Sequence, residues 1–178
     1  MNAIKSLLLT SALVCSGNTF AQSAHDKEAS ATVKEGAAII ELGGAAGWNI
    51  KDRSWNSGPD VAVEITPIEN WLELEVGVTP LFRRHRSAEW DTDLLFKKPW
   101  DLSKQFEFMA GLGPEWVYTK EPGMRRNSIA AEAVLDVMYW PGSKRRFGMF
   151  IEPGYEYNFA RGHEKSFGVT AGLLIAIR

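Results

Sequence analysis

A strict alternation of side-chain character constrains the fold more than any other feature of this sequence. In the stretch FGMFIEPGYEYNF, residues 147–159, every second position from the first is aromatic, aliphatic or proline. The positions between them hold two glycines, a phenylalanine, an asparagine, Glu152 and Glu156. A period of two predicts a β-strand with two unlike faces. The aromatic face must meet a protein core or lipid, and the acidic face must meet water or a polar lumen.

The same alternation recurs along most of the chain, interrupted by short runs of proline, glycine, asparagine or charged residues. The segments are residues 36–48, 59–66, 70–82, 89–97, 104–118, 127–140, 145–159 and 165–177. Most have the roughly 9 to 11 residues that a tilted strand needs to cross a bilayer, although the second and fourth are short. No helical segment offers a crossover for a parallel sheet. The sequence therefore predicts an all-β fold, an eight-stranded antiparallel up-and-down β-barrel.

The connections between these segments alternate in kind. The brief ones, at residues 67–69, 98–103 and 141–144, each contain a proline. The others, which are mostly longer, are residues 49–58, 83–88, 119–126 and 160–164. A transmembrane barrel with both termini in the periplasm has short turns on that side and longer loops outside. The order of connections predicts this placement.

Aromatic residues on the apolar face lie near the strand ends. Toward the long loops they are Trp48, Phe82, Trp90, Trp116, Tyr118, Tyr157 and Phe159, and toward the short turns they are Phe96, Phe106, Tyr139 and Phe147. Two aromatic girdles around an aliphatic band are typical of a transmembrane barrel. A secreted soluble barrel that binds an apolar ligand, as lipocalins do, would show the same alternation with the apolar face inward, so it stays an alternative.

The opposite face is rich in carboxylates and glycines, and Lys97 is its only base. Its predicted acidic network consists of Glu64, Glu73, Glu75, Glu107, Glu115, Glu132, Asp136, Glu152 and Glu156. Carboxylates in a narrow lumen must be hydrated, protonated or paired. We expect arginines from the barrel ends to reach them and close ion pairs that stiffen the barrel. A narrow cation-selective or proton-conducting path is the functional alternative.

Arginines gather in the segments predicted to be outer loops. The candidate rim consists of Arg83, Arg84, Arg86, Arg125, Arg126 and Arg161. The planar guanidinium suits phosphate groups, so this rim could pair with lipopolysaccharide in the outer leaflet. Ordinary solvated loops would have the same composition.

Motifs for catalysis and metal binding are weak. The cluster His163, Glu164 and Ser166 keeps open the alternative of a lipid A modifying hydrolase or acyltransferase, but closeness in sequence does not establish a catalytic triad. The carboxylates lack the loop spacing of a calcium motif. We therefore predict no enzymatic activity, no catalytic residues, no metal site and no cofactor.

The N-terminus predicts export. Residues 1–21 have a lysine, a short apolar run and small residues before the expected cleavage point, which is the layout of a signal peptide. Residues 22–35 are polar, which predicts a flexible periplasmic leader. Residues 36–178 are expected to form the barrel domain. The single cysteine, Cys15, lies within the signal. The formal net charge of −2 gives no indication of nucleic-acid binding.

Several stretches together resemble a known family. WLELEVGVTPLF, TDLLFKKPW, FEFMAGLGPEW, FIEPGYEY and RGHEKSFGVTAGLLIAI are similar to a family of small, largely uncharacterised proteobacterial outer-membrane β-barrel proteins of the porin-like superfamily. The resemblance implies the barrel fold and an outer-membrane location but no catalytic residues.

These observations together predict a small outer-membrane barrel with a structural or interaction role and weak ion or solute passage. Its expected partners are outer-membrane lipid, lipopolysaccharide and the barrel assembly machinery, and we expect a monomer. The chain ends in Arg178 without the aromatic residue that the assembly machinery reads in many barrels. The sequence therefore leaves open how the chain inserts.

Overall fold

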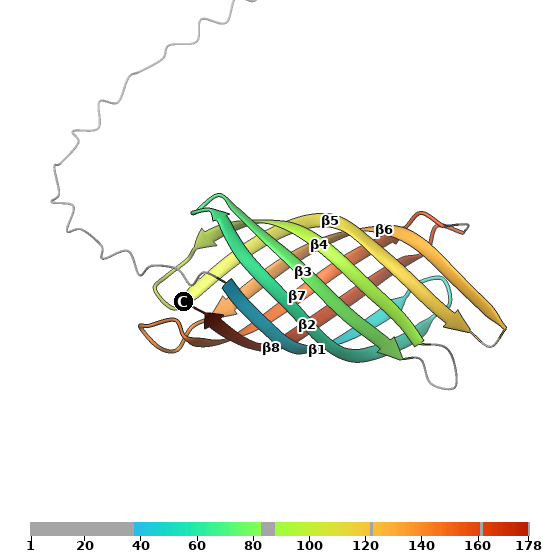
Figure 1. Cartoon of the computed structure of the whole chain (residues 1–178), viewed down its shortest axis with the longest axis horizontal. Coiled ribbons are helices and arrows are strands. Elements are labelled where there is room, and N and C mark those ends of the chain that lie inside the picture. Colours follow the sequence, from blue (N-terminus) through green and yellow to red (C-terminus); the bar gives the residue numbers. More distant parts are fainter. Residues whose placement is uncertain (1–37, 83–87, 122, 161, 178) are drawn as a thin grey trace, which may run out of the picture. The chain divides into compact units, whose positions relative to one another are not determined.

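The computed structural model describes residues 38–82, 88–121, 123–160 and 162–177. The predicted signal peptide and leader, residues 1–35, lie outside the described residues. Eight antiparallel strands follow one another in chain order, and β1 pairs with β8 to close a barrel (Figure 1). The strands are β1 Ala38–Asn49, β2 Ser54–Ile68, β3 Leu72–Phe82, β4 Ala88–Asp101, β5 Phe106–Glu121, β6 Met124–Tyr139, β7 Phe147–Asn158 and β8 Lys165–Ile177. The predicted fold class is confirmed.

Nowhere in the described part of the chain is there a helix long and apolar enough to cross a membrane.

The barrel has two ends, which we name by their connections. The turn end holds residues 69–71, 102–105 and 140–146, together with the start of β1 and the end of β8. The loop end holds the connections from β1 to β2, β3 to β4, β5 to β6 and β7 to β8, of which residues 50–53, 123, 159–160 and 162–164 are described. The connections at the two ends are similar in length, so the predicted contrast between short turns and long loops is wrong. The strands instead continue through segments that the sequence pattern assigned to loops.

Proline explains why several strands were predicted too short. Strand β2 has 15 residues and β4 has 14, and they include Pro59 and Pro99, which the sequence analysis treated as boundaries. The cost of proline in a sheet is a missing N–H group. Between β2 and β3 the ladder is interrupted between the pairs Ser57–Phe82 and Val61–Val78, where Pro59 and Pro80 lie. The strand continues past the interruption because pairing resumes on both sides.

The exposed fractions along β7 show which face of the strands points out of the barrel. Phe147, Met149 and Ile151 have exposed fractions of 62%, 55% and 50%, whereas Phe150 and Glu152 are buried. The same orientation holds around the barrel. Outward aliphatic side chains include Val61, Val63, Ile65, Val76, Leu112, Leu135 and Leu173. This arrangement contradicts the soluble lipocalin-like alternative, because such a barrel would turn its apolar face inward.

Outward aromatic side chains lie near both ends. At the loop end the rings of Trp48 and Trp55 are 5.1 Å apart, and at the turn end those of Phe106 and Tyr139 are 4.8 Å apart. Trp71 and Trp100 are also exposed near the turn end. The sequence analysis did not include Trp55, Trp71 or Trp100 in the girdles, because it placed Trp55 and Trp100 in connections and Trp71 at the very start of a strand.

The interior of the turn-side half contains an apolar cluster beside several buried acids. Met109, Met138, Trp140, Phe150 and Leu174 form a buried cluster, with exposed fractions of at most 5%. We call this cluster the apolar layer. Acids share this level, because Glu41 is the register partner of Leu174 and Glu107 is that of Met138. Burial of these side chains closes the barrel interior near the turn end.

Inward glycines leave room for the largest interior side chains. A Cβ atom at Gly111 would lie 2.7 Å from Cγ of Lys97, and one at Gly148 would lie 2.8 Å from the ring of Trp140. Contacts that short require the neighbour to move. These two glycines therefore allow a lysine and a tryptophan to fit within an eight-stranded barrel, whose interior is just wide enough for side chains.

Candidate functional site: an acidic interior around Lys97

A single buried lysine organises the middle of the barrel. Lys97 extends inward from β4 with an exposed fraction of 1%. Its Nζ lies 2.5 Å from Oε2 of Glu152 and 3.4 Å from Oδ2 of Asp136, and it also pairs with Glu75. Oε2 of Glu64 lies 4.0 Å away. One ammonium group thus ties β4 to four other strands, β2, β3, β6 and β7.

This arrangement makes Lys97 more important to the interior than any single carboxylate. Among the described residues it is the only lysine or arginine with a buried side chain. Removing one partner of a buried ion pair leaves an uncompensated charge, which is more costly than the pair is stabilising. Lys97 was noted in the sequence as the sole base on its face, but nothing in the pattern indicated that it would lie at the centre.

In the structure, the side chains of all nine acids of the predicted network lie on the inward face of the strands. Those with buried side chains are Glu64, Glu73, Glu75, Glu107, Glu115, Asp136 and Glu152. Glu132 and Glu156 are half-buried. Three further buried acids, Glu41, Asp60 and Asp91, lie on the same face. Glu41 was recognised on this face but left out of the predicted network, and Asp60 was missed because it follows Pro59 at a predicted strand start.

Inward acids on the loop side of Lys97 line a cavity of about 90 Å³. This volume holds several water molecules. Two pairs of acids lie directly opposite each other across neighbouring strands, Asp93 with Glu115 and Glu132 with Glu156. Facing like charges are destabilising unless water, protons or cations separate them. We call this space the acidic cavity.

Uncharged groups donate hydrogen bonds to some of the carboxylates that line the acidic cavity. The hydroxyl of Thr79 donates to Oδ1 of Asp60 at 2.6 Å, and the backbone N–H of Gly77 donates to Oδ1 of Asp93 at 3.1 Å. By contrast, Oε2 of Glu115 is buried and has no hydrogen-bond partner within the described residues. The cavity can therefore accept protons or positively charged groups.

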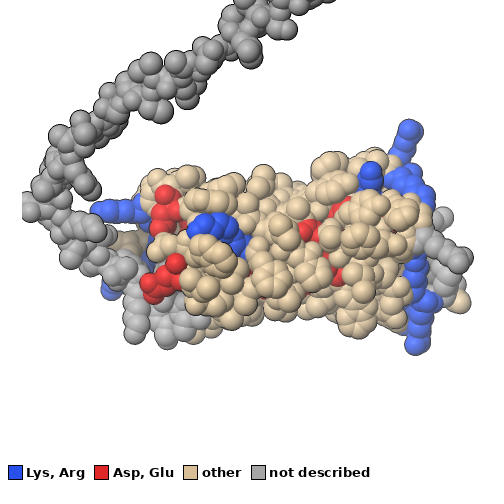
Figure 2. Space-filling model, turned by 90° about the horizontal axis from the view of Figure 1, so that it is seen from above, with Lys and Arg blue, Asp and Glu red and all other residues tan. Residues whose placement is uncertain are grey.

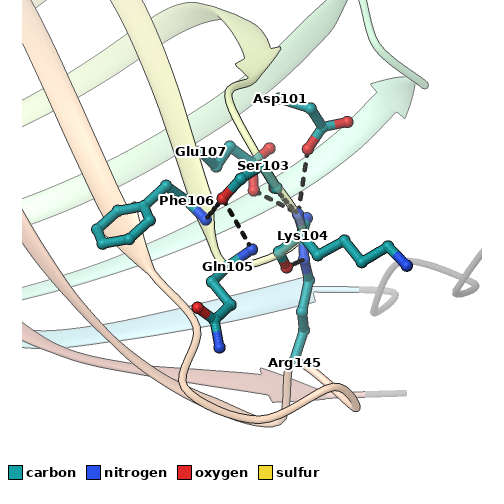
Figure 3. A network of polar contacts seen from close by, with 7 residues as sticks. All are labelled: Asp101, Ser103, Lys104, Gln105, Phe106, Glu107 and Arg145. Atoms are coloured by element: carbon teal, nitrogen blue, oxygen red, sulfur yellow. Dashed lines mark hydrogen bonds and ion pairs between the residues drawn. The ribbon is translucent and has the colours of Figure 1, made fainter.

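Arg145 closes the turn end (Figure 3). Its guanidinium reaches Oε2 of Glu107 at 3.2 Å and Oδ1 of Asp101 at 3.1 Å, and it donates to the carbonyl groups of Ser103 and Lys104. The connection at residues 140–146 is thereby fastened to the connection at residues 102–105. The sequence analysis expected arginines from the ends to reach inward carboxylates, and Arg145 does so for Glu107.

At the loop end, basic side chains lie outside the acidic cavity. Figure 2 shows mostly uncharged side chains along the barrel and a concentration of lysine and arginine at the loop end. Arg125 is exposed, and Nη1 of Arg126 lies 3.9 Å from Oε1 of Glu164. The other four predicted rim residues, Arg83, Arg84, Arg86 and Arg161, lie outside the described residues.

The three residues considered for catalysis each contact a different residue. Nδ1 of His163 lies 3.0 Å from the hydroxyl of Tyr157, and Oε2 of Glu164 accepts from Asn49 at 3.4 Å. Ser166 pairs in register with Glu156. The contacts of these three side chains do not form a nucleophile, base and acid relay of the kind that hydrolysis requires.

No protein-family model matches the chain. No curated protein sequence matches it either.

Solved structures with a similar fold do exist, and they are small outer-membrane barrels. Neisserial surface protein A matches with a TM-score of 0.63 at 12% identity, covering 79% of this chain and 96% of that one. The N-terminal β-barrel domain of Pseudomonas aeruginosa OprF matches with a TM-score of 0.56 at 9% identity, covering 80% and 100%. Ail, the attachment invasion locus protein of Yersinia pestis, gives a TM-score of 0.55 at 12% identity, covering 79% and 98%. Ail in complex with the heparin analogue sucrose octasulfate gives a TM-score of 0.58 at 13% identity, with the same coverage. At these identities, the likeness shows that the chain has the fold of small transmembrane barrels.

Proposed function

We propose that this protein is a monomeric outer-membrane barrel with a structural and interaction role. The observation that carries the proposal is the outward apolar belt with aromatic side chains near both ends, such as Trp55 and Trp116 at one and Trp71 and Phe147 at the other. In water such a surface would drive association, whereas in a bilayer it matches the hydrocarbon layer and its two interfaces. The export signal predicted at residues 1–21 supports this location.

Fractionation combined with heat-modifiability tests the location. We expect the protein in the outer-membrane fraction, with different electrophoretic mobility before and after boiling, because a folded barrel resists detergent unfolding. A chain that stays soluble in the periplasm without detergent contradicts the proposal.

Passage of ions or solutes is a second candidate, favoured by the acidic cavity and opposed by the apolar layer. Rings of carboxylates select cations, but conduction requires a continuous wet path. Met109 and Met138 have exposed fractions of 0%, and Trp140 has 2%, so the path ends at this level. We propose that the protein forms a closed cup. Planar-bilayer recordings should show no conductance, and stable cation-selective steps would instead support the passage hypothesis.

We propose further that the basic loop end binds the phosphates of lipopolysaccharide. The support is the concentration of lysine and arginine at that end, together with the exposed side chain of Arg125. The similar fold of Ail has been solved with a highly sulfated ligand. Arginine forms charge-assisted pairs with such anionic groups.

Paired vesicle measurements test this surface. Replacing Arg125 and Arg126 with glutamine should weaken binding to vesicles that contain lipopolysaccharide, and added salt should weaken binding of the unmodified protein in the same way. Replacing Lys104 and Arg146 at the turn end is the matched control. Equal effects from both pairs would show general charge attraction and contradict a specific rim.

We propose that the chain has no enzymatic activity. The separate partners of His163, Glu164 and Ser166 support this view. The lipid A hydrolase alternative makes a clear prediction: the purified protein should release acyl chains from lipid A, and His163→Ala should abolish the release. We expect no acyl release from either protein.

We propose that assembly uses the barrel assembly machinery. Ile177, the last described residue, is outward and exposed, and so continues the apolar face. Depletion of the machinery should reduce the amount of heat-modifiable protein. Unchanged folding after depletion would contradict this route.

A further inference from the structure

Three fully buried carboxylates meet on the interior wall beside Lys97. Glu41 comes from β1, Glu64 from β2 and Asp136 from β6, and their exposed fractions are 1%, 1% and 0%. One carboxylate oxygen from each lies within 4.8 Å of an oxygen from each of the others. We call these residues the carboxylate triad.

The carboxylate triad has unused acceptor atoms. Within the described residues, Oε1 of Glu41, Oε1 of Glu64 and Oδ1 of Asp136 are buried without a hydrogen-bond partner. Native structures leave few buried polar atoms unsatisfied, so three in one place indicate that a partner belongs there.

Lys97 neutralises the triad only in part. Its Nζ uses the other oxygen of Asp136 and stands 4.0 Å from the second oxygen of Glu64, while its closest contacts are Glu75 and Glu152. One positive charge therefore serves five carboxylates in a buried space. Unpaired buried carboxylates are strongly unfavourable, so the triad requires added positive charge or protons.

We propose that the carboxylate triad binds one Ca²⁺ ion. All available ligands are oxygen atoms, which favours a hard cation over zinc, copper or iron. Mg²⁺ demands near-ideal octahedral geometry and usually keeps several waters. Glu41, Glu64 and Asp136 do not line the acidic cavity. Ca²⁺ accepts irregular geometry and carboxylates that bind through both oxygens, so it fits this site better.

Of the described residues, only the side chain of Lys97 and its partners lie between the carboxylate triad and the acidic cavity. Glu75 and Glu152 line the acidic cavity and also contact Lys97, which in turn contacts Asp136 of the triad. The triad is thus separated from the cavity by the side chain of Lys97. A cation can pass from the cavity to the triad when that side chain moves.

The test measures calcium bound to the folded protein. The full chain, purified in detergent and stripped with a chelator, is dialysed against Ca²⁺ in the presence of equal Mg²⁺, and bound calcium is counted by mass spectrometry. We expect one Ca²⁺ per chain. Glu64→Gln and Asp136→Asn should each weaken binding by about tenfold or more, since even changes to groups that only support the ligands cost 10–100-fold in affinity. Glu115→Gln, in the acidic cavity, is the matched control and should keep the ion.

A thermal measurement separates the triad from a general effect of charge. Ca²⁺ should raise the temperature at which the unmodified, heat-modifiable barrel unfolds, because a ligand that binds only the folded state stabilises it. The same addition should not change Glu64→Gln. Without calcium, Glu64→Gln should unfold at a higher temperature than the unmodified chain, since one of three crowded charges is gone.

Three results would overturn the proposal. The first is an unmodified chain that retains no calcium in the presence of Mg²⁺, which would mean that protons neutralise the triad. The second is an equal loss of calcium in Glu115→Gln, which would place the ion in the cavity. The third is an equal calcium-dependent rise in Glu64→Gln and the unmodified chain. If Glu64→Gln lacks the heat-modified band, Glu41→Gln and Asp136→Asn are compared with the control in its place.

Discussion

The two halves of the barrel interior differ sharply although the same eight strands build both. On the turn side, Met109, Met138 and Phe150 pack with Trp140 and Leu174, and the ion pairs of Arg145 close the end. On the loop side, acids such as Glu115 and Glu132 surround a cavity of about 90 Å³. The first half combines the packed apolar layer with buried acids such as Glu64 and Asp136, and the second holds further acids and the cavity.

The difference shows how a narrow barrel can keep charge inside without becoming a pore. The apolar layer supplies stability through burial, as the core of a soluble domain does. Lys97 lies at the boundary, where one cation joins carboxylates from the strands on both sides of β4. The loop-side half is packed less tightly, so its cavity is available for cations, protons or water.

The largest expected effect comes from removing the boundary cation. Lys97→Met should destabilise the barrel by about 3–5 kcal/mol, because Glu75, Asp136 and Glu152 lose their buried partner. Urea unfolding of the protein in lipid vesicles measures the change. Lys98→Met, which alters a neighbouring lysine that is not fully buried, should change the free energy of unfolding by less than about 1 kcal/mol. Equal losses from both variants would contradict a central role for Lys97.

Breaking the apolar layer should have the next largest effect. Trp140→Ala should cost about 3 kcal/mol, because a large buried ring is replaced by a cavity. Trp100→Ala removes an outward tryptophan and should cost less when both are measured by the same unfolding experiment. The reverse order would indicate that the layer does not carry the stability of the turn-side half.

Opening the turn end should have a smaller effect. Arg145→Ala removes bonds to two carboxylates and two carbonyl groups, and we expect a loss of about 1–2 kcal/mol, reduced by partial solvent exposure. Hydrogen exchange should rise in the connections at residues 102–105 and 140–146. Arg146→Ala, an exposed neighbour, should leave exchange in both connections unchanged, and faster exchange in that variant would contradict the specific role of Arg145.

The smallest effect is expected in the loop-side half. Thr79→Val removes the hydroxyl that donates to Asp60, and we expect a loss of about 1 kcal/mol. Thr92→Val, on the outward face of the next strand, is the control, because it makes the same change of side chain outside the barrel interior. A loss as large as that from Trp140→Ala would show that the loop-side half is as tightly constrained as the turn-side half.

Much of the fold could be predicted from the sequence because alternation is a local property. Each strand shows its two faces within a few residues, so the sequence separates the face of Ile151 from that of Glu152, and the structure shows that Ile151 is the outward one. The strand ends were less predictable. Pro59 and Pro99 interrupt a pattern locally, but their effect depends on which neighbouring strand would have received the missing hydrogen bond.

The interior site was predictable only in part. The sequence places Glu64, Asp136 and Lys97 on one face, but it does not say which of them meet, because they come from different strands and the contacts depend on register. Similarly, the apolar layer combines inward residues from several strands. On each strand these residues stand among inward glycines and acids, so no single segment of the sequence reveals the cluster. The carboxylate triad has no sequence motif for the same reason.

Lipid accessibility along β7 is the most direct test of the central claim, which is that the apolar face meets lipid and the acidic face lines a closed interior. The only cysteine of the chain, Cys15, lies in the predicted signal peptide, so single cysteines can carry spin labels at known positions. Met149→Cys, Phe150→Cys, Ile151→Cys and Glu152→Cys are labelled and reconstituted in bilayers, and collision with oxygen dissolved in lipid is measured. The account predicts high collision rates at 149 and 151 and low rates at 150 and 152. High rates at 150 and 152, or rates without alternation, would contradict it.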